Sequence, residues 1–109
     1  MQLNNFSHPI VATSMGSTVT GPAIDNGSYP LASVQAAWTG TPTGTLKLQI
    51  SNDPLAGSWT DYTGSSVSLT GTSDTTAWFF ENASRWVRVV YTFASGAGTL
   101  DVYVSQKAW

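Results

Sequence analysis

The sequence reads Gly-Thr-Leu-Lys-Leu-Gln-Ile-Ser over Gly44–Ser51 and Gly-Thr-Leu-Asp-Val-Tyr-Val-Ser over Gly98–Ser105. Apolar residues occupy every second position of both copies, and because side chains of a strand alternate between its faces, each copy has one apolar face. Trp38–Thr39 precedes the first copy and Tyr91–Thr92 the second, each followed by a loop rich in Gly, Thr or Ser. This pattern predicts a β-hairpin used twice. Two such hairpins bury matching apolar faces by packing against each other.

The rest of the chain also favours strands. Apolar alternation, or β-branched and aromatic residues between turn signals, predicts strands at Leu31–Thr39, Val67–Leu69, Thr76–Glu81 and Trp86–Phe93, an edge strand or arm at Ile10–Ser17 and an edge strand at Val19–Ile24. No helical periodicity is present. We therefore expect an all-β fold, an antiparallel β-sandwich of jelly-roll type with about six to eight strands. Residues 1–109 form one domain, with residues 1–9 as a candidate N-terminal arm.

Composition narrows the classes of partner. Only 9% of residues are charged, the net charge is −2, and Ser and Thr together number 29, so we expect a hydroxyl-rich surface. Four basic residues are too few for a multi-phosphate footprint, which argues against nucleic acid as a partner. No segment reaches the ~20 apolar residues of a membrane span, so no membrane partner is expected. The N-terminus lacks the features of a secretory signal, which predicts synthesis in a cytoplasm.

Residues suited to catalysis are scarce. The chain has no cysteine and a single histidine, His8, so neither a thiolate metal site nor a nucleophile with a neighbouring imidazole is indicated. The six acidic residues are scattered among predicted turns and strands, where Asp usually caps its own backbone. We expect no catalytic residue, no metal site and no cofactor, and hence no enzyme.

Several aromatic residues are candidates for contacts between subunits. Trp78, Phe79 and Phe80 are consecutive, so at least one of them faces away from the buried side of its strand. Either another part of the chain or a neighbouring subunit covers it. Phe6 and Trp109, close to the two ends of the sequence, are further candidates. A Trp side chain left in water forgoes roughly 2 kcal/mol of favourable burial free energy, so we expect Trp109 to dock on its own chain or on a neighbour.

The loop after the first repeat is the best candidate for a ligand site. Trp59 and Tyr62 would stack on a sugar ring, and Asn52, Asp53 and Asp61 would accept hydrogen bonds from its hydroxyl groups. The competing interpretation is structural: Asn52 and Asp53 form an Asx turn, and Trp59 folds over it to close the end of the sandwich. The sequence favours the structural interpretation.

A resemblance adds to this picture. Ser33–Asp53, followed by Trp59–Asp61 and Arg85–Thr92, resembles small β-sandwich proteins encoded among the structural genes of tailed phages, and the similarity spans about residues 12 to 107. These proteins have a jelly-roll appearance similar to that of discoidin or galactose-binding domains. The resemblance implies a role in capsid decoration, in a connector or tail, or in carbohydrate binding, and it implies no catalytic residue.

The preferred functional hypothesis is a phage virion structural protein, a capsid decoration or cement subunit. Its expected partners are the major capsid protein or other virion proteins, together with further copies of itself in a homo-oligomer. The chain would be made in the host cytoplasm and would reside in the virion. The alternative is a carbohydrate-binding module of a tail or surface appendage, with a glycan as its ligand.

Overall fold

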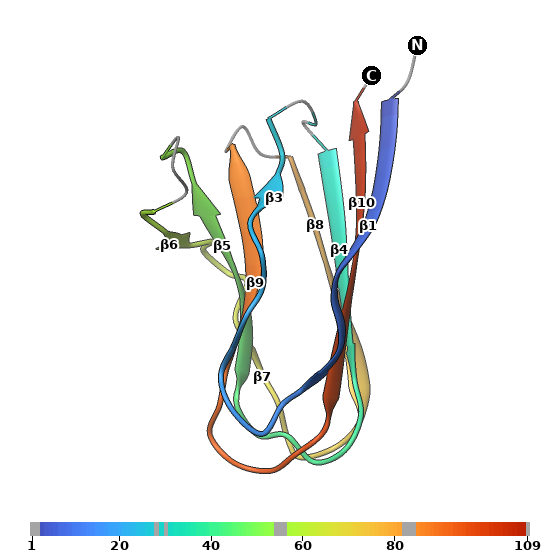
Figure 1. Ribbon diagram of the computed structural model, residues 1–109, viewed down its shortest axis with the longest axis vertical. Helices are drawn as coiled ribbons and strands as arrows, with labels where there is room; N and C mark the ends of the chain where they lie inside the picture. Colours follow the sequence, from blue (N-terminus) through green and yellow to red (C-terminus); the bar gives the residue numbers. More distant parts are fainter. Residues whose placement is uncertain (1–2, 28, 30, 54–56, 82–84, 109) are drawn as a thin grey trace.

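The computed structural model describes residues 3–27, 29, 31–53, 57–81 and 85–108, and these form two packed antiparallel β-sheets (Figure 1). The four-stranded sheet has the order β1-β10-β4-β8, with strands β1 (Leu3–Ser14), β10 (Thr99–Ala108), β4 (Leu31–Trp38) and β8 (Asp74–Glu81). The second sheet is built on β5 (Thr45–Ser51) and β9 (Trp86–Thr92), flanked by the two-residue strands β2 (Val19–Thr20), β3 (Ile24–Asp25), β6 (Thr60–Asp61) and β7 (Val67–Ser68).

The topology is that of a jelly roll. Both β2 and β3 pair with β9, and both β6 and β7 pair with β5, so each couple acts as one interrupted strand. Counted in this way, each sheet has four strands, which is the two-sheet arrangement of eight-stranded jelly rolls. The predicted all-β antiparallel sandwich is confirmed.

The predicted hairpins are wrong. Strand β4 pairs with β10 and β8, whereas β5 pairs with β9, so the strands on either side of each repeat loop belong to opposite sheets. Residues 39–44 and 93–98 therefore form arches that cross from one sheet to the other at the lower end of Figure 1. Crossing lets each strand bury its apolar face against the strand that follows it in the chain, which a flat hairpin does not do.

The two arches lie against each other. The backbone N–H groups of Thr39, Thr41 and Thr43 in the first arch donate to carbonyl oxygens of Thr99, Ala97 and Ser95 at 3.0, 2.7 and 3.1 Å. This contact is very close at the glycines that begin each repeat. A Cβ atom on Gly98 would lie 1.8 Å from the Thr39 carbonyl oxygen, and one on Gly44 would lie 1.9 Å from that of Thr92. The repeated Gly is thus required by the approach of the two loops.

The first strand includes most of the candidate N-terminal arm. From Leu3 onward, β1 pairs with β10, with Leu3 opposite Ala108 and Ser7 opposite Val104. Register irregularities follow between Ser7 and Ile10 and again between Ile10 and Thr13. Described residues 3–9 are therefore part of the sheet, because β10 supplies the ladder of hydrogen bonds that their backbone needs.

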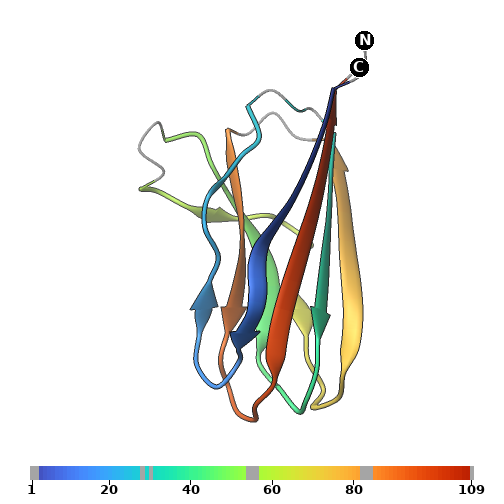
Figure 2. The same ribbon diagram turned by 45° about the vertical axis from the view of Figure 1, so that its right-hand side comes forward.

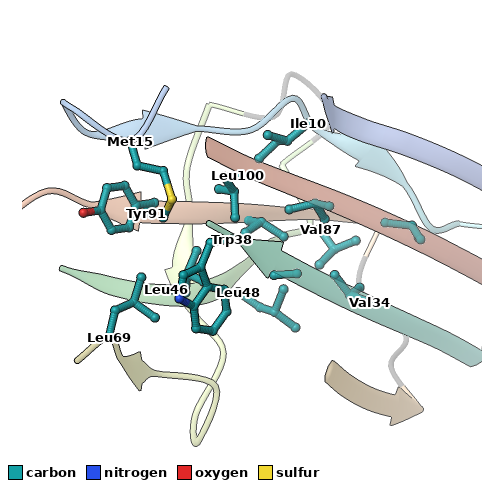
Figure 3. Close-up of a cluster of buried hydrophobic side chains, with 14 of the residues drawn as sticks. Ile10, Met15, Val34, Trp38, Leu46, Leu48, Leu69, Val87, Tyr91 and Leu100 are labelled. Atoms are coloured by element: carbon teal, nitrogen blue, oxygen red, sulfur yellow. The ribbon is translucent and has the colours of Figure 1, made fainter. Parts of the chain in front are cut away.

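The core fills the space between the sheets (Figure 3). Inward-facing side chains alternate along β4, β5 and β10, and the fully buried side chains of the core include Val34, Leu46, Leu48, Val87, Tyr91, Leu100 and Val102. One of the buried side chains in β10 is polar. Gln106 donates from Nε2 to Oδ1 of Asn26 at 2.7 Å and accepts from Nδ2 of Asn5 at 2.9 Å, so its burial is compensated by hydrogen bonds.

Within the described residues, no helix has the length and hydropathy needed to cross a membrane.

Candidate functional site

An aromatic row crosses the outer face of the four-stranded sheet. The strand register places Phe6 of β1 opposite Ser105, Ser105 opposite Ser33, and Ser33 opposite Phe79 of β8. Phe6 is 72% exposed and Phe79 is 80% exposed, so both rings stand in solvent on the two edge strands. Three strand spacings of about 4.8 Å put the two edge positions about 14 Å apart, with only serines between them.

A third ring lies in the neighbouring row. Tyr103 of β10 is 46% exposed and pairs with Gln35, which in turn pairs with Ala77 of β8. His8 stacks on Tyr103 with ring centroids 4.3 Å apart. We call the seven residues of the two rows the aromatic face: Phe6, Ser33, Gln35, Ala77, Phe79, Tyr103 and Ser105.

The aromatic face carries no formal charge. Beside it, Nε2 of His8 lies 3.1 Å from Oδ1 of Asp101, and that same oxygen accepts a hydrogen bond from the backbone N–H of Ala12 at 2.9 Å. The Asp101 carboxylate, two residues from Tyr103, is therefore engaged within the chain. Large exposed apolar side chains without charge are typical of surfaces that bind another molecule.

The opposite outer face, on the second sheet, is polar and internally bonded. Asp61 receives hydrogen bonds from Nε2 of Gln49 at 2.9 Å and from Nζ of Lys47 at 3.1 Å. Nε of Arg88 donates to Oε1 of Gln49 at 2.8 Å, and the Arg88 guanidinium carbon lies 4.2 Å from the centroid of the Trp59 ring. A cation–π contact therefore occupies one face of the indole.

Two pKa values reflect this network. The hydrogen bonds from Gln49 and Lys47 hold the pKa of Asp61 below its ordinary value of 3.8. Partial burial lowers the pKa of Arg88 from its ordinary value, because removal from water disfavours the charged form. Both groups stay ionised near neutral pH, so the network holds its charges in place.

Replacing Asp61 by asparagine is expected to change how stability depends on pH. Because the folded-state pKa of Asp61 is below 3.8, its carboxylate contributes stability above that pH and loses the contribution as pH falls through the folded-state pKa. The wild type should therefore exceed Asp61→Asn in stability near neutral pH, and the difference should shrink in acid. Urea unfolding of both proteins between about pH 7 and about pH 2 measures this difference. A gap that is constant across the range would contradict the prediction.

The five glycan candidates make different contacts within the chain. Trp59 and Asp61 lie in the outer network, whereas Tyr62 is half-buried and packs against the core. Oδ1 of Asn52 accepts from the backbone N–H of Arg85 at 2.8 Å. Oδ2 of Asp53 accepts from the N–H of Gly57 at 3.2 Å, which ties the loop to itself.

The interface candidates divide in a different way. Phe6 and Phe79, far apart in the sequence, are brought into one row of the aromatic face. Trp78 points to the inner side, where it packs against the core and donates from Nε1 to the carbonyl oxygen of Ser65 at 2.8 Å. The side chain of Phe80 and all of Trp109 lie outside the described residues.

Sequence reasoning missed the other members of the aromatic face. Tyr103 lies at an outward position of the second repeat, so its exposure follows from the alternation of that strand. Its neighbours Gln35 and Ala77 come from strands whose pairing with it was not predicted. The sequence therefore indicates which single residues face outward, but only the register of the strands shows that they lie side by side.

Comparison with known proteins identifies the fold. No protein-family model matches the chain, and no curated protein matches it in sequence. Among solved structures, the chain is similar to the SPBc2 prophage-derived protein YomS, with a TM-score of 0.58 and 14% identity over 96% of this chain and 95% of YomS. It is similar to the PBSX exported protein XepA, with a TM-score of 0.62 and 16% identity over 95% of this chain and 36% of XepA.

A third solved structure is the C-terminal CBM6 of LamC from Zobellia galactanivorans, with a TM-score of 0.53 and 9% identity over 95% of this chain and 98% of that module. At these identities the likeness concerns the fold alone. The chain is a β-sandwich of the kind found both in phage-derived proteins and in carbohydrate-binding modules.

Proposed function

We propose that the chain is a structural protein of a tailed-phage virion, a decoration subunit that docks on the capsid through its aromatic face. The observation that carries the proposal is the row of the aromatic face in which Phe6 and Phe79 stand 72% and 80% exposed. Exposed aromatic residues are the side chains most enriched at the centres of protein interfaces. The sandwich fold shared with YomS, a prophage-derived protein, is consistent with this role.

The role requires binding energy and no catalysis. A decoration subunit stabilises a shell by contacting neighbouring capsid proteins, and rigid aromatic anchors on a sheet provide such contacts at low cost in side-chain entropy. The net charge of −2 adds little electrostatic repulsion between copies crowded on one shell. The chain would accordingly bind the major capsid protein and reside in the virion.

Replacing Phe79 by serine is expected to weaken binding to capsids. The test uses shells of the major capsid protein of the same phage, assembled without this chain, and measures binding by co-sedimentation. We expect Phe79→Ser to raise the dissociation constant by at least about tenfold, the loss typical of an interface hot spot. Phe93→Ser is the matched control, since Phe93 is 37% exposed and lies outside the aromatic face. Equal effects of the two variants, or no binding by the wild type, would contradict the proposal.

A second candidate function is binding of a neutral glycan on the same face. The observation in its favour is that two aromatic rings flank Ser33 and Ser105, because sugar rings offer both an apolar face and hydroxyl groups. The likeness in fold to CBM6 of LamC is consistent with it. An array of neutral oligosaccharides distinguishes the alternatives: binding lost in Phe79→Ser but kept in Trp59→Ala would favour the glycan, and an array without hits would remove it.

A further inference from the structure

Three of the four sheet edges are interrupted. The second sheet ends in two-residue strands, β2 and β3 on one side and β6 and β7 on the other. On the four-stranded sheet, β1 contains Pro9 and two register irregularities, and Ala12 within it has a φ of +43°. Bulges, prolines and very short strands are the devices by which proteins prevent unwanted pairing at an edge.

Strand β8 is the exception. All eight of its residues pair in unbroken register with β4, from Asp74 opposite Trp38 to Glu81 opposite Leu31. The strand contains no proline and no lysine, and its acidic residues are at its two ends. In Figure 2 it stands at the margin of the four-stranded sheet, and the described residues place no strand beyond it. In such an edge strand, alternate backbone N–H and C=O groups point outward and can bond to another strand.

The side chain of Phe79 indicates which strand would pair there. Phe79 belongs to the edge strand itself, and its ring is 80% exposed. An antiparallel pair of identical strands is self-complementary about a two-fold axis perpendicular to the sheet, and such an axis keeps both outer faces on the same side. Phe79 would then pack beside the β8 strand of the partner subunit, and the two aromatic faces would form one continuous surface. A second copy supplies the same strand, which is in unbroken register and carries charge only at its two ends, so each β8 offers the other a matching row of backbone donors and acceptors.

We propose that β8 is a self-association edge, at which two copies of this chain join their four-stranded sheets into one eight-stranded sheet. The low net charge of −2 permits the approach of two identical surfaces. The two subunits would contact each other only along their β8 strands, through backbone hydrogen bonds and the Phe79 side chains. Because this contact is small, we expect the dimer to be reversible and its population to depend on protein concentration. This inference does not rest on the virion role, because it concerns the edge and not what the aromatic face binds.

The test is sedimentation equilibrium of the full chain over a concentration series. We expect a reversible dimer for the wild type, and a dissociation constant raised at least about tenfold by Ala77→Lys, which places like charges on both sides of the seam. Gln35→Lys is the matched control, since Gln35 is directly opposite Ala77 in the next strand inward and adds the same charge to the same face. It should leave the dissociation constant within about twofold of the wild-type value. A monomeric wild type, or equal effects of the two lysines, would overturn the proposal.

A second measurement covers the case in which Ala77→Lys fails to fold. The chain contains no cysteine, so a single introduced thiol reports its own position. Under a short bismaleimide, Ala77→Cys should give a covalent dimer, whereas Gln35→Cys should not, because each copy then holds the thiol one strand, about 4.8 Å, further from the seam. Equal crosslinking would overturn the proposal. Co-sedimentation of the wild type with capsids tests the virion role without any measurement of self-association, so either idea can fail alone.

Discussion

Alanine in place of Gly98 is expected to destabilise the protein by at least about 3 kcal/mol, the upper end of the cost of overpacking. The new Cβ atom would lie 1.8 Å from the carbonyl oxygen of Thr39 and 3.0 Å from its carbonyl carbon. Both neighbours are backbone atoms, so no side-chain rotation relieves the contact and the arches must separate. Separation weakens the hydrogen bond from Thr39 N–H to the Thr99 carbonyl oxygen, which adds roughly 1 kcal/mol.

Urea unfolding followed by tryptophan fluorescence measures this effect, and Gly16→Ala provides the control. A Cβ atom on Gly16 would meet only the hydroxyl oxygen of Ser14, at the ordinary contact distance of 3.5 Å. Neither Gly16 nor Gly98 has a positive φ, so the comparison isolates the close approach from backbone strain. If Gly98→Ala and Gly16→Ala have the same stability, the contact between the arches is not as the structure describes it.

Alanine in place of Trp38 is expected to cost about 3 to 5 kcal/mol, as for large aromatic residues removed from a core. Trp38 ends β4, is 6% exposed and lies near Leu46 and Leu48 of the opposite sheet (Figure 3). Its removal leaves a cavity where the chain begins to cross from one sheet to the other. The strands around the cavity are held by backbone hydrogen bonds, so neighbouring side chains have little freedom to move into it.

Trp38→Phe separates packing from hydrogen bonding. The indole Nε1 donates to the carbonyl oxygen of Thr72 at 2.9 Å, and phenylalanine keeps much of the ring volume but loses this donor. We expect a loss of about 1 to 2 kcal/mol for Trp38→Phe. Thermal unfolding of both variants beside the wild type gives the comparison. A loss for Trp38→Ala no larger than that for Trp38→Phe would show that burial of the ring is not what holds this end of the core.

The strands were predictable because alternation is a property of each stretch by itself. In Leu46–Ile50 and Leu100–Val104 every second residue is apolar. The structure buries the side chains of Leu46 and Leu48 in the first stretch and of Leu100, Val102 and Val104 in the second. Alternation assigns residues to faces, but it does not say which strand lies beside which. The hairpin prediction failed for this reason, since an arch and a hairpin present the same pattern of residues. The distinguishing property, contact between two loops distant in sequence, belongs to the folded chain alone.

The same limit applies to the site. Phe79 could be predicted to face outward within a run of three aromatic residues, but its place in a row with Phe6 depends on two intervening strands. In the opposite direction, Gln106 continues the apolar positions of the second repeat and is fully buried, held there by Asn5 and Asn26 from remote segments. A glutamine at such a position indicates burial only when its partners are known.

The jelly-roll pairing also determines when the protein can fold. No long strand pairs with the long strand that follows it: β1 needs β10, β4 needs β8 and β10, and β5 needs β9. Every extended ladder therefore requires closure of a large loop before it gains any contact energy, which places such chains among those that fold in milliseconds to seconds. Since β10 lies between β1 and β4, a ribosome must release Thr99–Ala108 before the four-stranded sheet can assemble. Until β10 has emerged, β1 and β4 thus expose backbone edges that proteases or other nascent chains can reach.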